Sequence, residues 1–151
     1  MALKGIDIEK RQELVFLLNT VSTHFTFIRD EICVPYGLTS TQSLVLFDIF
    51  RNPTKTKVTD ICKRLKKDTN TISPLLNRLV EKGFLTKEKD PNDSRAVIVK
   101  VTEKSKKILF DIEQDISDYS IPCFEGVTDA QYDVVYKILN KIIEVMEKWD
   151  I

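Results

Sequence analysis

The fold is decided by residues 57–101, which read KVTDICKRLKKDTNTISPLLNRLVEKGFLTKEKDPNDSRAVIVKV. The apolar residues in the first part of this stretch recur at three- and four-residue spacings, which predicts two short helices. The first helix spans 57–65 and the second runs to about Lys82. The polar residues 66–68 form a tight turn between them, and this arrangement is typical of a helix-turn-helix.

A change of period follows the second helix at Gly83, a residue type that commonly stops a helix. Residues 84–88 are a short strand candidate, and residues 96–101 alternate apolar with β-branched side chains. The turn-forming residues 90–94 separate the two strands, so the pattern predicts a β-hairpin with a polar tip.

Helices flank this segment on both sides. A long helix is predicted over 8–34, and a T-x-x-Q capping box at Thr39 opens a short helix through Phe50. Downstream, Thr102 caps an amphipathic helix that Pro122 interrupts or ends, and a second T-x-x-Q box at Thr128 opens the last helix.

The predicted class is therefore mostly α with a small β-hairpin wing. A chain of 151 residues suits a single domain. Within it, residues 38–101 form a winged helix-turn-helix, and residues 1–37 and 102–151 form flanking helices.

The net charge of zero hides a strong asymmetry along the chain. Residues 1–53 carry a net charge of −1, residues 54–107 carry +8, and residues 108–151 carry −7. On charge alone, a solvated lysine-rich face is an equally good interpretation. Because the basic segment coincides with the helix-turn-helix and the hairpin, we expect it to bind double-stranded DNA, with the second helix in the major groove.

Other classes of protein find little support. The sequence has no glycine-rich phosphate loop, no G-x-S-x-G or H-E-x-x-H motif, and one histidine, so we expect no enzyme, metal site or cofactor. Cys33, Cys62 and Cys123 form no C-x-x-C pair, which indicates reduced thiols. With no long apolar run and no signal-peptide pattern, we expect a cytoplasmic protein with no membrane association.

Three motifs resemble the MarR family of transcriptional regulators. They are residues 58–73, the junction Leu79-Val80-Glu81-Lys82-Gly83-Phe84-Leu85 and the wing motif Asp90-Pro91-Asn92-Asp93-Ser94-Arg95. Two departures are Ser94, where many members have arginine, and Ser105, where glycine is common. The local sequence Ser73-Pro74 predicts a helix that starts at Pro74. The resemblance instead implies a start near Thr69, with Pro74 inside the helix. We favour the earlier start.

The candidate DNA contacts lie on the second helix and the wing. Polar side chains near the helix start can reach base edges or phosphates, and Lys87 and Lys89 can contact phosphates. Arg95 can enter a minor groove with Asp93 holding its orientation; the alternative is an ion pair within the wing. The expected DNA-binding residues are Thr69, Asn70, Thr71, Ser73, Asn77, Arg78, Lys87, Lys89, Asp93 and Arg95.

The resemblance also implies a homodimer that binds a pseudo-palindromic operator and responds to a small-molecule effector, acting as a repressor. Thr20, His24 and Phe47 are the candidate effector-binding residues, with His24 expected to be partly buried. The first and last helices carry more apolar residues than one lobe can cover, and the expected dimerisation residues are Leu14, Leu18, Leu139, Ile142, Met146 and Trp149.

The nearest resemblance is to the peroxide-sensing OhrR-like branch, although Val15 fills the place of its sensing cysteine and Asn19 replaces a nearby tyrosine. Only a thiolate can attack a peroxide, so we expect no peroxide response. Two alternatives stay open: a winged helix that binds an acidic protein partner, and a thiol-based redox regulator that uses Cys33 or Cys123.

Overall fold

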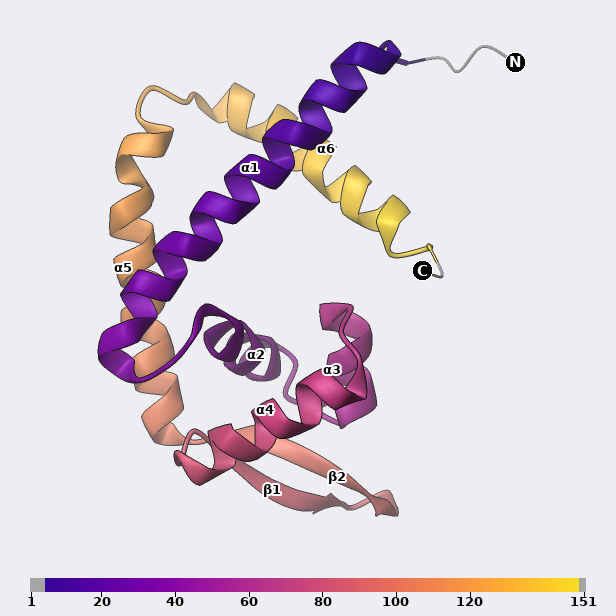
Figure 1. Ribbon diagram of the computed structural model, residues 1–151, viewed down its shortest axis with the longest axis vertical. Coiled ribbons are helices and arrows are strands. Elements are labelled where there is room, and N and C mark those ends of the chain that lie inside the picture. Colours follow the sequence, from indigo (N-terminus) through magenta and orange to yellow (C-terminus); the bar gives the residue numbers. More distant parts are fainter. Residues whose placement is uncertain (1–4, 150–151) are drawn as a thin grey trace. The chain divides into compact units, whose positions relative to one another are not determined.

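The computed structural model describes residues 5–149, which fall into two compact units, one up to Ile116 and the other from Ser117 (Figure 1). The elements are α1 (Ile8–Cys33), the 3-10 helix η1 (Val34–Tyr36), α2 (Ser40–Arg51), α3 (Val58–Leu65), α4 (Thr69–Glu81), β1 (Leu85–Asp90), β2 (Asp93–Val101), α5 (Glu103–Phe124) and α6 (Asp129–Met146). The predicted mostly helical class with one hairpin is confirmed. A single-domain organisation stays a prediction.

The predicted helix boundaries follow from local capping chemistry. Thr39 and Thr128 each accept a hydrogen bond from the backbone of a glutamine three residues on, and that glutamine bonds back, so both capping boxes are present. Gly83 has a φ of 77°, a left-handed conformation in which a side chain is strained, and it directly follows the C-cap of α4.

The hairpin tip and the end of α5 differ from the prediction. The hairpin tip is shorter than the cluster 90–94, because Asp90 pairs with Asp93 and leaves Pro91 and Asn92 between the strands. Pro122 does not interrupt α5, which continues to Phe124. A proline near the end of a helix removes one N–H donor from the last turns, so the helix stops shortly after it.

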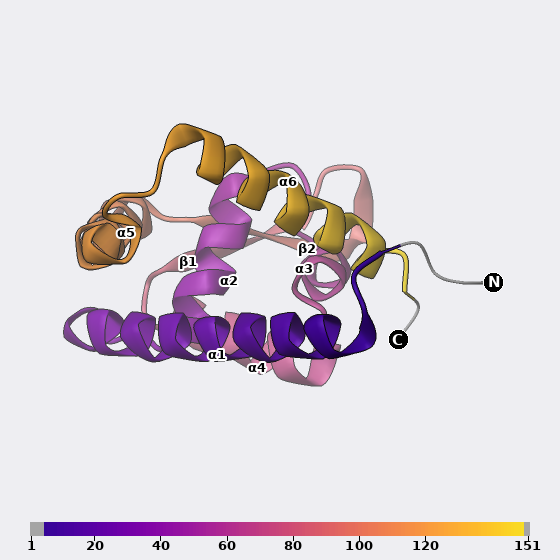
Figure 2. The ribbon, with the colours of Figure 1, turned by 90° about the horizontal axis from the view of Figure 1, so that it is seen from above.

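The core of the first unit lies between α2, α3, α4, the start of α5 and one face of the hairpin. The face of α4 that packs there consists of Ile72, Leu76 and Leu79, at the spacing of one helix side. Figure 2 shows α2 leading away from α1 at a steep angle. Only the end of α1, around Cys33, is buried within this unit.

The hairpin pairs β1 with β2 in antiparallel register, with Lys87 opposite Val99. Lys57, just before α3, forms a bridge to Ile98 on the other edge of β2. The wing is therefore attached to the helix-turn-helix along its second strand. Among the described residues, no helix is long and apolar enough to cross a membrane.

Candidate nucleic-acid interface

The start of α4 presents polar side chains to solvent. The helix begins at Thr69 with Asp68 as its N-cap, so the earlier of the two predicted starts is confirmed and Pro74 lies inside the helix. Because proline has no N–H, the carbonyl of Asn70 receives no helical hydrogen bond from position 74. The predicted contacts on this helix are exposed, except for half-buried Ser73: Thr69, Asn70, Thr71, Asn77 and Arg78.

The carboxylate of Asp68 holds the first turn of α4 in place. Its Oδ1 accepts the N–H of Thr71 at 2.7 Å. This hydrogen bond, together with the Thr71 hydroxyl, lowers the pKa of Asp68 below its ordinary value. The first turn of α4 is thus capped by a side chain next to it in the sequence.

The wing carries two cationic side chains that have no hydrogen-bond or ion-pair partner within the described residues, Lys89 and Arg95. Asp93 accepts the backbone N–H of Arg95 at 3.1 Å, rather than pairing with its guanidinium. The alternative of an Asp93–Arg95 ion pair within the wing is therefore not found here. Lys87 instead donates to Asn77 Oδ1, which joins the wing to α4.

The base of the wing is fixed by an ion pair that the sequence reasoning missed. Lys57 Nζ lies 2.8 Å from Asp90 Oδ2 and 3.7 Å from Asp93 Oδ2. The hydrogen bond from Lys57 lowers the pKa of the buried Asp90 carboxyl, and the same bond raises the pKa of Lys57. Next to it, Thr56 accepts the N–H of Val99 at 3.3 Å, so the loop before α3 holds the wing.

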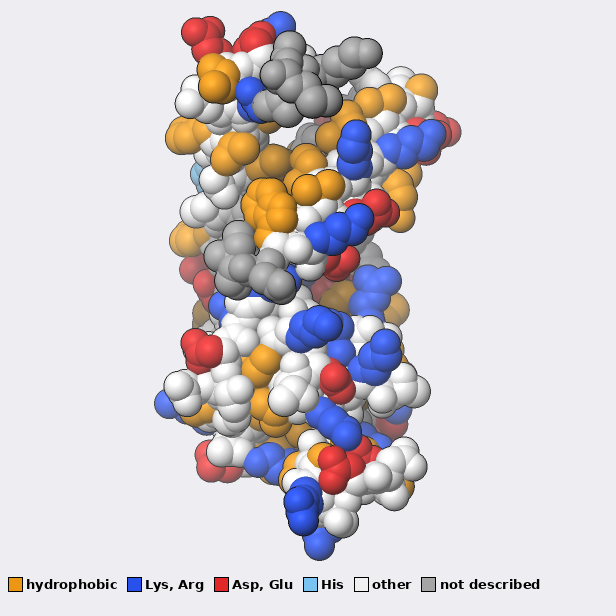
Figure 3. All heavy atoms as spheres, turned by 90° about the vertical axis from the view of Figure 1, so that its right-hand side faces the viewer, with side chains coloured by type: hydrophobic (Ala, Val, Ile, Leu, Met, Phe, Trp, Pro, Cys, Tyr) orange, Lys and Arg blue, Asp and Glu red, His pale blue; other side chains and the backbone are white. Residues whose placement is uncertain are grey.

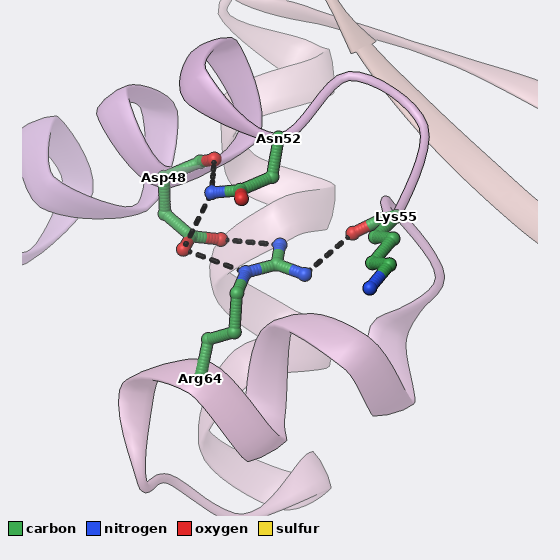
Figure 4. A network of polar contacts seen from close by, with 4 residues as sticks. All are labelled: Asp48, Asn52, Lys55 and Arg64. Carbon is green, nitrogen blue, oxygen red and sulfur yellow. Dashed lines mark hydrogen bonds and ion pairs between the residues drawn. The ribbon is translucent and has the colours of Figure 1, made fainter. Parts of the chain in front are cut away.

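A second network fixes α3 against α2 (Figure 4). Arg64 donates to both carboxylate oxygens of Asp48, at 2.8 and 2.6 Å, and to the carbonyl of Lys55 at 2.8 Å. Asn52 donates to the carbonyl of Asp48 at 2.8 Å. The guanidinium of Arg64 is thus paired within the lobe, although Arg64 belongs to the basic segment.

Internal pairing reduces the number of cations that face solvent freely. Lys57, Arg64, Lys100 and Lys106 all have carboxylate partners. The lower part of Figure 3 shows Lys and Arg side chains over the helix-turn-helix and wing, with acidic ones among them. Within the described chain, the cations of this segment without a partner are Lys55, Lys63, Lys66, Lys67, Arg78, Lys89, Arg95 and Lys107.

The candidate effector residues differ in exposure. Thr20 is half-buried and its hydroxyl donates to the carbonyl of Phe16 at 2.9 Å. Phe47 packs against the core, with the Arg51 guanidinium 5.4 Å from its ring centre. His24 is exposed, so its expected partial burial is wrong for the single chain.

The candidate dimerisation residues leave large apolar side chains in solvent. Leu14 and Leu18 on α1 are 49% and 38% exposed. In the second unit, Leu139 and Met146 of α6 are exposed and Ile142 is half-buried. Trp149 is exposed and lies beyond the end of α6 at Met146.

The three cysteines occupy different environments. Cys33 is fully buried, and this burial raises the pKa of its thiol despite a hydrogen bond with Ser43. Cys62 is half-buried against the core, as expected from its place on α3, and Cys123 is exposed. Burial makes Cys33 a poor source of thiolate, which weakens its case as a redox sensor.

Comparisons with known proteins agree with this geometry. The family described as transcriptional regulator SarA/Rot matches residues 28–112. An uncharacterised HTH-type transcriptional regulator of Bacillus subtilis, YcgE, is 23% identical over 98% of this chain and 96% of its own. A MarR protein from Peptoclostridium difficile is 27% identical with a TM-score of 0.77, covering 97% of this chain and 93% of its own.

A structure of Escherichia coli MarR in complex with operator DNA is 25% identical with a TM-score of 0.74, covering 91% of this chain and 98% of its own. It shares the winged-helix arrangement of helices and hairpin described above. The protein therefore belongs to the SarA/Rot family of transcriptional regulators and is a DNA-binding regulator with a MarR-type winged-helix fold.

Proposed function

We propose that this protein is a homodimeric repressor that binds a pseudo-palindromic operator and leaves it when a small-molecule effector binds. One observation carries the DNA-binding part. The exposed first turn belongs to α4, and the unpartnered guanidinium of Arg95 belongs to β2 of the hairpin, whose other strand is joined to α4 by the Lys87–Asn77 hydrogen bond. Other cations of the segment are paired internally.

The proposed contacts divide by groove. The exposed hydroxyls and amides at the start of α4 read base edges in the major groove, and Asp93 orients the wing backbone so that Arg95 enters the adjacent minor groove. Lys89, without an internal partner, neutralises a phosphate. Lys87 contacts the DNA backbone in this proposal, and it either keeps its hydrogen bond to Asn77 or exchanges that bond for a phosphate.

The proposed dimer rests on the apolar side chains of α1 and α6. Leu14, Leu18 and Met146 are each exposed in the single chain, and exposed apolar patches of this kind mark interaction sites. A two-fold axis pairs the same surface on both copies and presents two recognition helices about one helical turn of DNA apart.

Repression and effector release extend the proposal beyond the relatives' printed descriptions. Thr20, His24 and Phe47 are the proposed effector contacts, and a cytoplasmic location goes with the function. The OhrR-like run Ser73-Pro74-Leu75-Leu76 remains a resemblance, and the absence of cysteine at Val15 favours a ligand over a peroxide as the signal.

The test measures binding to duplex DNA by fluorescence anisotropy at a series of salt concentrations. Log affinity is expected to fall with log salt by roughly 0.9 for each neutralised phosphate. Arg95→Ala is expected to weaken specific binding by about 1–3 kcal/mol. Lys10→Ala, at the start of α1 beside Asp7, is the control and should bind as the wild type does.

The rival function is a winged helix that binds an acidic protein. It predicts no preference for a specific duplex over random competitor DNA, and an Arg95→Ala variant with unchanged DNA affinity. Either of these results would overturn the proposed operator contact.

A further inference from the structure

The hydrogen bond between Lys87 on β1 and Asn77 on α4 joins two side chains that were each expected to meet DNA separately. On α4, the exposed residues Asn70, Pro74 and Asn77 recur at the spacing of one helix side. This side is opposite to the side that packs on the core. Asn77 therefore belongs to the face of α4 that is free to enter a groove.

The pleat of the hairpin directs Lys87 toward the packed side of the wing. Successive side chains of a strand point to opposite faces, so Lys87 shares a face of β1 with the buried Leu85. In the hairpin register it stands opposite Val99, which is 1% exposed. The stem of Lys87 thus leaves the face that packs on the lobe, and its ammonium meets the amide of Asn77.

The chemistry of these two groups fixes the orientation of the amide. An ammonium group has N–H donors and no acceptor, so it bonds to the oxygen of an asparagine amide and not to its nitrogen. Oδ1 of Asn77 accepts from Nζ of Lys87, and the Nδ2 donors are left for another partner. Within residues 5–149, Lys87 pairs with no carboxylate, so its positive charge stays beside the amide. The pair therefore offers donors and positive charge to a ligand.

The base edges of the major groove differ in what they offer to such a pair. An asparagine with a free amide reads adenine, because its oxygen accepts from the N6 amino group while its nitrogen donates to N7. That contact needs the oxygen that Lys87 occupies. Guanine presents acceptors at both N7 and O6, whereas thymine presents a single acceptor beside a methyl group and cytosine presents a donor. Guanine is therefore the base that best suits a pair of donors.

We propose that Lys87 holds Asn77 as a donor-only reader of a guanine in each half-site of the operator. Nδ2 of Asn77 donates to N7 or O6 of the guanine, and Lys87 is a positioning residue that keeps Oδ1 from the amino group of adenine. This base selection rests on the proposed operator binding and names the base that one residue reads. Lys87 thus keeps its hydrogen bond to Asn77 on the DNA and does not exchange it for a phosphate.

The test selects binding sites from a pool of randomised duplexes with the full-length protein and sequences the bound fraction. Duplexes that differ only in the base pair at one position are then compared by fluorescence anisotropy. The position read by Asn77 is the one whose base preference disappears in Asn77→Ala. There, the wild type should bind the guanine duplex about tenfold more tightly than the adenine duplex.

Variants of the two wing lysines separate positioning from charge. Lys87→Met should shift the preference to adenine, because Oδ1 is then free to accept. Lys87→Arg keeps N–H donors at this place and should retain the guanine preference. Lys89→Met is the matched control, because it removes an exposed charge from the same strand and should weaken binding to all four duplexes alike. Circular dichroism should show the same folded state for all of these exposed substitutions.

An adenine preference of the wild type at this position, or a guanine preference that survives Lys87→Met, would overturn the proposal. An Asn77→Ala variant that keeps every base preference would do the same, because Asn77 would then read no base. Both results leave operator binding intact. A wild-type protein that enriches no sequence would instead refute operator binding and the base selection together.

Discussion

Replacing Arg64 with methionine tests how the helix-turn-helix is held together. The substitution keeps an unbranched apolar stem but removes three hydrogen bonds, two to the Asp48 carboxylate and one to the Lys55 carbonyl. Asp48 then remains as a largely buried carboxylate without its cation.

The magnitude follows from burial. The side chains of Arg64 and Asp48 are 24% and 10% exposed. Removing one member of a fully buried pair costs about 3–5 kcal/mol, and the partial exposure of Arg64 favours the lower end, about 3 kcal/mol. For a chain of this size, that loss lowers Tm by about 6–12 °C.

The assay is urea and thermal unfolding by circular dichroism at one fixed protein concentration, since dimerisation couples stability to concentration. Asp48→Leu and the double variant complete a cycle, in which the double variant should recover about 2 kcal/mol relative to the sum of the single changes. Lys63→Met, an exposed neighbour on α3, should change stability by less than about 0.5 kcal/mol.

A loss below about 1 kcal/mol for Arg64→Met, or additive effects in the cycle, would refute the argument that this network holds α3 in place. In DNA binding, folded Arg64→Met should keep the wild-type salt dependence, because Arg64 is already paired internally. A reduced slope would place Arg64 on a phosphate instead.

Three further predictions concern pH, thiols and assembly. Because the pKa of Asp90 is below its ordinary value of 3.8, its contribution is present above about pH 4 and is lost as pH falls through the lower folded value, so Asp90→Asn should flatten acid unfolding measured by circular dichroism. Stoichiometric organic hydroperoxide should leave operator affinity unchanged in an anisotropy assay; release that disappears in a Cys33→Ser, Cys123→Ser variant would contradict this. Deleting residues 135–151 should yield a monomer by sedimentation and abolish operator binding without removing a groove contact, whereas a dimer of the shortened chain would exclude α6 from the interface.

Local sequence chemistry predicted most of the fold because the signals were themselves local. The two T-x-x-Q boxes and Gly83 act within a few residues, and each lies where it was expected. The start of α4 was harder, because Ser73-Pro74 is a good local helix start. The first turn capped by Asp68, and the burial of Ile72 one residue before this step, override that preference.

The candidate site was predictable in its residue types but not in its pairings. No spacing in the sequence reveals that Lys57 is bound to Asp90 or Arg64 to Asp48, because these contacts join elements far apart in the chain. Charge counting therefore overestimated the cations that are free to meet DNA. The exposure of His24 could not be foreseen either, since the apolar period of α1 predicts a covered face without saying what covers it.

In α4, the residues that pack on the lobe differ from the residues that face solvent, and this separation bears on how such regulators diverge. Its fully buried contacts with the lobe are Ile72, Leu76 and Leu79, with half-buried Leu75 and Val80 packed against the same core, whereas Thr69, Asn70 and Thr71 are exposed. Exchanges at those exposed positions leave the core untouched, so the fold sets few constraints on them. A duplicated copy of the gene can thus acquire a new operator through a few surface changes, with its folding stability nearly unaltered.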